Sequence, residues 1–401
     1  MLIIVLALAI FAGLYMAWSI GANDVANSMS TAVGAKAITL RQALVIAAVL
    51  NFLGAVLVGK HVTDTIKGKI VDISSMSSHD AMLGFLAALL AASIFVTLAT
   101  WKELPVSTTH AIVGGVAGFG LAQGGIEAVK WATLGKVAAS WVISPLAGAG
   151  LAFIMFMIIK RFIFDAKEPF VAARKLSPFF ISLTLFIIFL SVFMKTRVGT
   201  MLGYTTEEYL LLSLALSIFL GMVGYFLLIR RKGVKKRVYE LVEGLFRRLQ
   251  IMTSCYVAFS HGANDVANAV GPVAVIIAFA WKEVDTLYLL AFGGIGLAIG
   301  ITTWGYKVIR TVGGRITALT NTRGFSVDFG AATVVLVASK LGLPISTSHT
   351  VVGAVIGVGL ARGLDAVDLG VIKNIIYSWL LTLPFTAIVS ILIYMGLRII
   401  F

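Results

Sequence analysis

The heptapeptide GANDVAN occurs twice in this chain, at residues 21–27 and 262–268, each time at the end of a long apolar run. Each copy places one carboxylate and two side-chain amides in a segment that is otherwise hydrocarbon. Polar residues inside a membrane segment are costly and by default indicate function. Carboxylate, amide and freed backbone carbonyl oxygens are hard donors, which suit a hard cation such as Na⁺ and not zinc or copper.

The candidate ion and substrate ligands are therefore the acids and amides of both copies, namely Asn23, Asp24, Asn27, Asn264, Asp265 and Asn268. A lone buried carboxylate tends to take up a proton, so each aspartate is either a sodium ligand or a proton carrier. Gly21 and Gly262 are expected to loosen their helices and permit unwinding, which would expose backbone carbonyls. The alternative is that these side chains only cross-link helices, but such a role does not require a complete heptapeptide twice.

A second pair of motifs, PVSTTH at residues 105–110 and PISTSH at residues 344–349, places three consecutive hydroxyls after a proline and before a Gly-rich apolar stretch. Proline followed by serine or threonine is typical of a helix start. Free N–H groups and the positive end of the helix dipole make such a start an anion site. Two of them facing each other would hold a small tetrahedral oxyanion without Lys or Arg, and the ligands would be Ser107, Thr108, Thr109, Ser346, Thr347 and Ser348. Ordinary capping by Ser107 and Ser346 explains only one hydroxyl per copy.

His110 and His349 end these motifs, but no cysteine or HExxH spacing accompanies them, so a hydrogen-bonded structural role is favoured over a metal-binding one. Lys136 falls inside an expected span, where it pairs with a carboxylate or extends to the interface. An intramembrane hydrolase using Ser, His and Asp is disfavoured, because an enzyme with one nucleophile has no reason to duplicate it. The sequence predicts no enzyme activity and no cofactor.

The elements that carry these motifs are membrane helices. Hydrophobic residues make up 59% of the 401 positions, charged residues only 12%, and the mean hydropathy is +1.01, which predicts an all-α integral membrane protein. A bilayer core takes about 20 apolar residues per helix. Twelve candidate segments follow, near residues 2–34, 42–59, 81–100, 104–124, 130–160, 178–194, 209–229, 250–280, 286–303, 328–341, 343–361 and 370–400. The long, Gly-interrupted segments are expected to include broken or re-entrant helices at the membrane midplane.

The chain is internally duplicated. The second copies follow the first by 241 residues for the heptapeptide and by 239 for the hydroxyl motif. We therefore divide the chain into a first repeat at residues 1–160, a linker with two transmembrane helices at residues 161–248, and a second repeat at residues 249–401. Matching polar residues in two halves indicate one shared site.

The net charge of +14 comes largely from basic clusters at residues 160–175, 230–248 and 307–323. Because these clusters flank expected spans, they indicate cytoplasmic loops with affinity for membrane lipid rather than for nucleic acid. Counting spans outward from them places both termini outside, so the repeats have opposite orientations, with a site at the membrane midplane. A parallel duplication is the alternative. We expect a multi-pass protein of the cell membrane, and the sequence leaves room for a homo-oligomer.

On the basis of its duplicated heptapeptide, the chain resembles the inorganic phosphate transporters of the PiT type, whose paired signature is GANDVAN in each half. The stretch NSMSTAVGAKAITLRQA after the first copy is similar to the sodium-coupled branch. The resemblance covers both repeats and implies import of phosphate by sodium symport, with sodium as the coupling ion. It assigns phosphate to the six hydroxyls with Asn23 and Asn264, and sodium to Asp24, Asn27, Asp265 and Asn268.

The two halves of this expected site differ, because Ser348 stands where the first copy has Thr109, and the second heptapeptide continues AVGPVA instead of SMSTAVG. Importing an anion into a negative interior is uphill by about 2.3 kcal/mol per charge per 100 mV. At least two cations per monovalent phosphate are therefore needed, and Asp24 and Asp265 provide two places. A proton-coupled phosphate or sulfate permease is the alternative. Sulfate never donates a proton, so an acceptor beside the oxyanion would favour phosphate.

Overall fold

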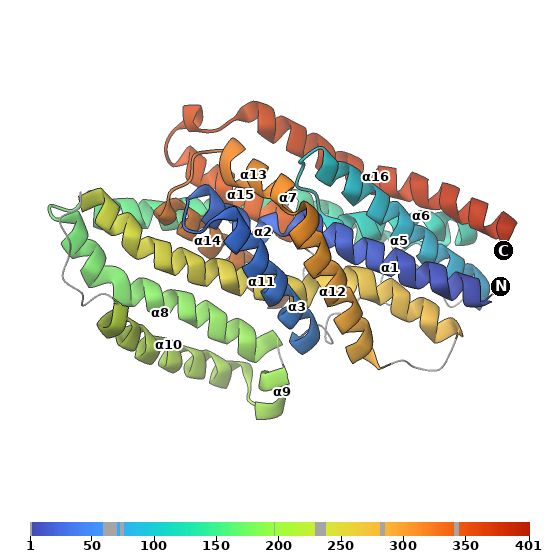
Figure 1. Ribbon diagram of the computed structural model, residues 1–401, viewed down its shortest axis with the longest axis horizontal. Coiled ribbons are helices and arrows are strands. Elements are labelled where there is room, and N and C mark those ends of the chain that lie inside the picture. The colour runs from blue at the N-terminus through green and yellow to red at the C-terminus, as the bar shows by residue number, and fades with distance from the viewer. Residues whose placement is uncertain are drawn as a thin grey trace.

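The apolar runs of this chain form helices, because a helix satisfies its own backbone polar groups inside a bilayer. The structure is a computed structural model that describes residues 2–58, 70–72, 76–195, 197–228, 238–280, 285–340 and 345–401. Most helices lie lengthwise beside one another, and between the described residues the only β pairing is an isolated bridge from Val71 to Val129 (Figure 1). The predicted all-α membrane fold is confirmed.

Nine stretches within the described ranges are long and apolar enough to cross a membrane. They are α1 (Leu2–Asp24) with α2 (Ala26–Gly34), α3 (Leu40–Val58), α5 (Ser78–Trp101), α7 (Trp131–Ile159), α8 (Pro169–Lys195), α10 (Thr206–Leu228), α11 (Val238–Ala280), α12 (Thr286–Trp304) and α16 (Leu369–Ile400). Two short helices serve as connections, namely α9 (Arg197–Leu202) and α13 (Tyr306–Arg310).

The other three expected segments also become helices, and two of them are short. These are α6 (Thr108–Gly124), α14 (Asn321–Lys340) and α15 (Thr347–Leu360). With 17 and 14 residues, α6 and α15 fall short of a full crossing, because a helix rises about 1.5 Å per residue and a bilayer core is about 30 Å thick. The two short helices are the ones that follow the hydroxyl motifs.

The expected unwinding is absent at Gly262, and in the first copy the helix is interrupted only at Val25, within the heptapeptide. α1 passes into α2 through Val25, whose backbone keeps right-handed helical angles, and α11 continues unbroken through the second heptapeptide. Both glycines serve close helix packing instead. A Cβ at Gly21 would collide with the backbone of Leu297 in α12, and one at Gly262 with the backbone of Asn51 in α3.

These glycine contacts are part of a reciprocal packing of helices between the two repeats. α1 packs on α12 while α11 packs on α3, and α6 packs on α16 while α15 packs on α7. Gly118 of α6 lies against the backbone of Ala387, and Gly357 of α15 against that of Ala149. The largest buried apolar cluster accordingly joins residues of α1, α5 and α6 to residues of α11 and α12. The repeats are interleaved, so neither can form the core alone.

The segment between the repeats contributes α8 and α10, which pack against each other, and α8 also contacts α11. The expected loop at residues 230–248 is shorter than predicted, because α11 begins at Val238 and includes Arg247 and Arg248. Similarly, Arg174 and Lys175 belong to α8. Other members of the expected basic clusters lie outside the described residues, namely Arg230, Arg231, Lys232, Lys235, Lys236 and Arg237.

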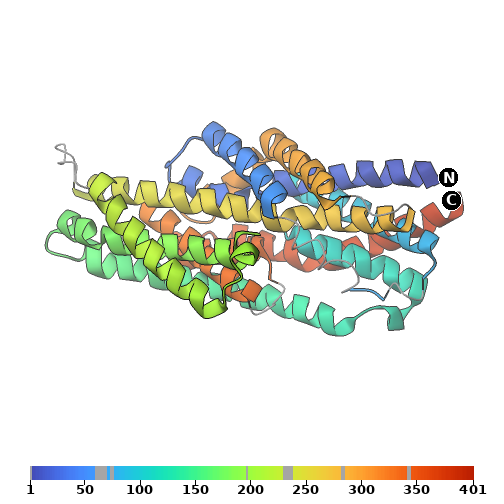
Figure 2. The ribbon, with the colours of Figure 1, turned by 90° about the horizontal axis from the view of Figure 1, so that it is seen from below.

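The first helices of the two repeats run in opposite directions along the long axis of the molecule. α1 starts at the end marked N and runs away from it, whereas α11 runs toward that end (Figures 1 and 2). The C-terminus of α16 lies beside the N-terminus in both views. This arrangement brings the two heptapeptides into the middle of the helix bundle.

Candidate functional site

The beginnings of α6 and α15 have the same construction. The Oγ of Ser107 accepts the backbone N–H of His110 at 3.2 Å, and the Oγ of Ser346 accepts that of His349, also at 3.2 Å. Serine is a preferred residue at this position because it satisfies one free backbone donor. One hydroxyl per motif is thus an ordinary cap, and the following two are available for other contacts. Pro344 lies outside the described residues.

The last asparagine of each heptapeptide crosses to the hydroxyl motif of the other repeat. Asn27 Nδ2 donates to Ser348 Oγ at 2.9 Å and lies 3.5 Å from Thr347 Oγ1. Asn268 Nδ2 donates to Thr109 Oγ1 at 3.0 Å. Because each amide reaches the opposite helix start, residues of both repeats form a single site.

Asp24 accepts a hydroxyl from each repeat. Thr108 Oγ1 donates to its Oδ2 at 2.6 Å, and Ser348 Oγ lies 3.3 Å from its Oδ1. The side chain is 1% exposed. A carboxylate so deeply buried in a membrane protein is expensive, which supports the functional reading of the heptapeptide.

Asp265 has a different partner, His261, which is not among the residues expected to form the site. His261 Nε2 lies 2.5 Å from Asp265 Oδ2 and 3.9 Å from Asp24 Oδ2. Asn51 donates its Nδ2 to the Ala47 carbonyl at 2.9 Å, which leaves its Oδ1 facing His261 Nδ1 at 2.8 Å. Since that oxygen only accepts, Nδ1 carries a proton. A second proton on Nε2 would make the ring a counter-ion for both acids.

One signal in the sequence marks His261. It directly precedes the second heptapeptide, where the first copy has Ile20. A difference between repeats at the residue beside a duplicated motif indicates where the two halves have diverged. No comparable signal marks Asn51, which is identified only by its contact with the imidazole.

Asn23 and Asn264, both expected to bind phosphate, occupy unlike surroundings. Asn23 is buried and holds the segment before α6, because its Nδ2 donates to Thr100 Oγ1 at 2.9 Å and to the Leu104 carbonyl at 3.0 Å, and its Oδ1 accepts the Val106 N–H at 3.1 Å. Asn264 is exposed and donates to Asp265 Oδ1 at 2.9 Å. The structure therefore brings neither amide to the hydroxyls of the two helix starts.

His110 and His349 meet between the two helix starts, with ring centroids 5.0 Å apart. His349 stacks on Trp379 at 3.8 Å, and His110 Nε2 lies 3.4 Å from Ser140 Oγ. These contacts join α6 and α15 behind the hydroxyls. Lys136 is exposed on α7.

The assembled site combines acids with the positive ends of two helix dipoles. The carboxylate oxygens of Asp24 and Asp265 and a ring nitrogen of His261 all lie within 4.8 Å of one another. Carboxylate, amide and hydroxyl oxygens fit a hard cation, whereas an imidazole nitrogen does not suit sodium. Two ionised acids repel an oxyanion, so the helix starts can hold one here only when cations or protons neutralise the acids.

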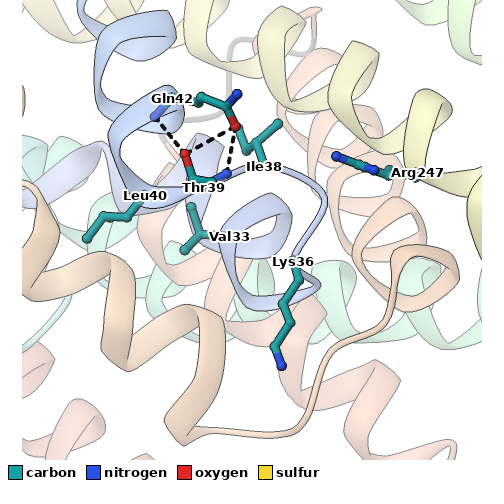
Figure 3. Close-up of a pocket in the computed structure, with 7 residues that line it drawn as sticks. All are labelled: Val33, Lys36, Ile38, Thr39, Leu40, Gln42 and Arg247. Carbon is teal, nitrogen blue, oxygen red and sulfur yellow. Dashed lines mark hydrogen bonds between the residues drawn. The ribbon is translucent and has the colours of Figure 1, made fainter.

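A separate cavity of about 290 Å³ lies between the turn after α2 and the start of α11 (Figure 3). It is lined by Val33, Lys36, Ile38, Thr39, Leu40, Gln42 and Arg247. Arg247 Nε donates to the Ala37 carbonyl at 2.7 Å, which links the first part of α11 to the first repeat. The lining has two cations and no acid, so it attracts anions but offers no carboxylate to an accompanying cation. The heptapeptide site, in contrast to this cavity, has groups for both an anion and a cation.

Three comparisons with known proteins all find phosphate transporters or permeases. The model of a family described as the phosphate transporter family matches residues 20–390. The chain is 46% identical to a putative phosphate permease of Pyrococcus furiosus, over 98% of this chain and 96% of that protein. It is 40% identical to the chloroplastic inorganic phosphate transporter 2-1 of Arabidopsis thaliana, over 95% of this chain and 70% of that protein. A solved structure of a sodium-dependent phosphate transporter superposes with a TM-score of 0.89 at 49% identity, covering 99% of this chain and 100% of the other.

Proposed function

The chain belongs to the phosphate transporter family, and from this membership we propose that it imports inorganic phosphate together with sodium ions as a secondary active symporter. The family consists of transporters and not of enzymes, which excludes the hydrolase alternative. The finer proposal concerns the coupling ion, the direction of transport and the mechanism.

The observation that carries the proposal is the crossed pair of amide–hydroxyl contacts beside two buried acids. Asn27 reaches Ser348 and Asn268 reaches Thr109, so the hydroxyls that would bind phosphate are held by the motif that would bind sodium. Loss of either ligand therefore changes the surroundings of the other. Such mutual dependence is what coupling between two ligands requires.

Charge balance supports more than one cation per phosphate. A cation beside Asp24 and another beside Asp265 would neutralise both acids and let the helix dipoles attract the oxyanion. Because each charge moved across the membrane is worth about 2.3 kcal/mol per 100 mV, two sodium ions with a monovalent phosphate let the membrane potential assist import. We propose Ser107, Thr108, Thr109, Ser346, Thr347 and Ser348 as the phosphate ligands, with Asn23 and Asn264 joining after movement of their helices.

We propose that transport proceeds by alternating access of two inverted repeats, residues 1–160 and 249–401. The opposite directions of α1 and α11 and the reciprocal packing of α1 on α12 and α11 on α3 support this assignment. The different surroundings of Asn23 and Asn264 also support it, because alternating access requires the two halves to exchange environments. In this proposal both termini face the outside of the cell membrane.

His261 favours one alternative, a proton-coupled permease. An imidazole lying 2.5 Å from Asp265 and 3.9 Å from Asp24 is able to carry a proton in place of a sodium ion. Phosphate is favoured over sulfate as the substrate, because the acids lie beside the hydroxyl motifs and a phosphate can share a proton with them.

The test is uptake of radiolabelled phosphate into proteoliposomes that contain the purified protein. We expect an inward sodium gradient to drive accumulation, and a proton gradient without sodium to drive little. Excess unlabelled phosphate should block uptake and sulfate should not. Accumulation driven equally well by protons alone would reject sodium coupling, and competition by sulfate would reject the substrate assignment.

A further inference from the structure

A tryptophan of the second repeat positions the hydroxyl motif of the first. Trp379 of α16 is 6% exposed, and its Nε1 donates to the Pro105 carbonyl at 3.0 Å. The residues on either side of Pro105 are held by Asn23, which donates to the Leu104 carbonyl and accepts the Val106 N–H. Three consecutive residues before α6 are therefore fixed by two side chains, one from each repeat.

The first repeat contains an equivalent of this tryptophan. The dipeptide Ser-Trp at residues 378–379 also occurs at residues 140–141. The offset of 238 is close to the offsets of 239 and 241 of the two duplicated motifs, so both copies belong to the same internal repeat. We therefore expect Trp141 of α7 to stand beside the start of α15.

The packing of the neighbouring helices agrees with this equivalence. A Cβ at Gly114 of α6 would collide with the Leu383 carbonyl of α16. A Cβ at Gly353 of α15 would collide with the Pro145 carbonyl of α7. Leu383 and Pro145 are again 238 positions apart, so α6 lies on α16 in the same register as α15 lies on α7.

The contacts of the two tryptophans differ in spite of this shared register. The ring of Trp379 stacks on His349, with centroids 3.8 Å apart and planes inclined by 20°. The ring of Trp141 lies 5.9 Å from His110, and these planes are inclined by 52°. The buried Nε1 of Trp141 has no hydrogen-bond partner. Since buried polar groups are nearly always hydrogen-bonded and an indole N–H only donates, this donor lacks an acceptor.

The asparagines of the two heptapeptides differ in the same sense. Asn23 holds the segment before α6, whereas Asn264 is exposed and donates to the neighbouring Asp265. Both side chains that fix the start of α6 thus have equivalents that are not engaged in the same way. Two separate pairs that differ together are expected when inverted repeats adopt two conformations and exchange them during transport.

We propose that Trp141 is a positioning residue for the second hydroxyl motif. In the opposite-facing state, Trp141 and Asn264 hold the start of α15, and Trp379 and Asn23 release the start of α6. This inference rests on the proposed alternating access of two inverted repeats. The N–H of Trp141 gains an acceptor when that of Trp379 loses one, so both states have a similar number of buried hydrogen bonds. The transporter can then pass between them without a large difference in stability.

The test compares W141F, W379F and the double variant of the full-length protein, purified and reconstituted in proteoliposomes. Phenylalanine keeps an aromatic ring but has no N–H donor. W141F should lower the melting temperature less than W379F, because only Trp379 donates a bond in the present state. W141F should nevertheless slow phosphate uptake about tenfold, as for loss of one buried hydrogen bond from the opposite state. The double variant loses one bond from each state, so its uptake should be faster than that of W141F.

The matched control is W131F at the start of the same helix, where Trp131 Nε1 donates to the Ile126 carbonyl at 2.9 Å. It should transport at the wild-type rate. Uptake by W141F at the rate of W131F would overturn the proposal, as would a double variant no faster than W141F, which is the result expected of a tryptophan that only fills space.

Hydrogen exchange gives a second measurement if the double variant does not fold. The Val106 N–H is bonded to Asn23 in the present state and is released in the opposite one. In W141F it should exchange no faster than in the wild type, and faster exchange would overturn the proposal. If neither a sodium nor a proton gradient drives phosphate uptake by the wild type, the proposed function itself fails, and this is seen before any variant is measured.

Discussion

Replacing Asp24 by asparagine removes a charge from the central site with little change in shape. The carboxylate accepts hydroxyls from Thr108 at 2.6 Å and Ser348 at 3.3 Å. An asparagine keeps one acceptor oxygen and offers an NH₂ group in place of the other, and either hydroxyl can rotate to accept from it. The variant should therefore fold, and its defect should come from the lost charge.

The magnitude follows from the distance between charges. A cation about 4 Å from a carboxylate is stabilised by about 4 kcal/mol at an effective dielectric constant of about 20. At about 1.4 kcal/mol per factor of ten, this corresponds to about a thousandfold loss of affinity for sodium. Such a loss exceeds what raising the sodium concentration in an uptake assay can restore, so D24N should not transport.

The assay is sodium-driven uptake of radiolabelled phosphate in proteoliposomes, with the amount of reconstituted protein determined for each preparation. The matched control is Asp285→Asn, because Asp285 is exposed and caps α12 by accepting the Leu287 N–H at 3.0 Å, a role that asparagine performs equally well. D285N should transport at the wild-type rate. Uptake by D24N with unchanged sodium dependence would refute the assignment of Asp24 as a cation ligand.

Three further predictions concern the helix starts, the packing and the topology. Thr108→Val removes a hydroxyl bonded to a carboxylate and should weaken phosphate affinity about 10- to 100-fold at fixed sodium in equilibrium binding; unchanged affinity would contradict its role. Gly262→Ala should lower the thermal unfolding midpoint, because overpacking costs about 1–3 kcal/mol of stability. Gly244→Ala, in the open part of the same helix, should not lower it. Equal midpoints for the two variants would contradict the close packing at Gly262. Cysteines placed at Leu2 and Ile400, after removal of the native cysteine, should both react with an impermeant reagent from outside, and labelling from opposite sides would contradict the proposed topology.

The helices and the two motifs were predictable because each depends on local sequence. Apolar length predicted the spans, and a serine after proline predicted the starts of α6 and α15, where Ser107 and Ser346 act as caps. The role of the glycines was not predictable in the same way. Gly21 contacts a helix that begins more than 200 positions later in the chain, and repetition of a motif does not specify which distant helix it meets.

The structural differences between the two repeats could not be predicted from the sequence either. Asn23 and Asn264 stand in identical heptapeptides, yet one is buried in hydrogen bonds and the other is exposed. Identical local sequence cannot express two environments, which depend on the conformation of the whole chain. The divergence from Ile20 marks the position of His261, but its role depends on the fold, which places Asp265 Oδ2 2.5 Å from the imidazole.

The most direct measurement is an experimental structure of the protein in sodium phosphate. We expect one phosphate per chain between the starts of α6 and α15, contacted by Thr108 and Ser348, with sodium ions beside Asp24 and Asp265. Phosphate bound instead in the cavity between Lys36 and Arg247, with Thr108 and Ser348 still bonded to Asp24 and Asn27, would contradict this assignment.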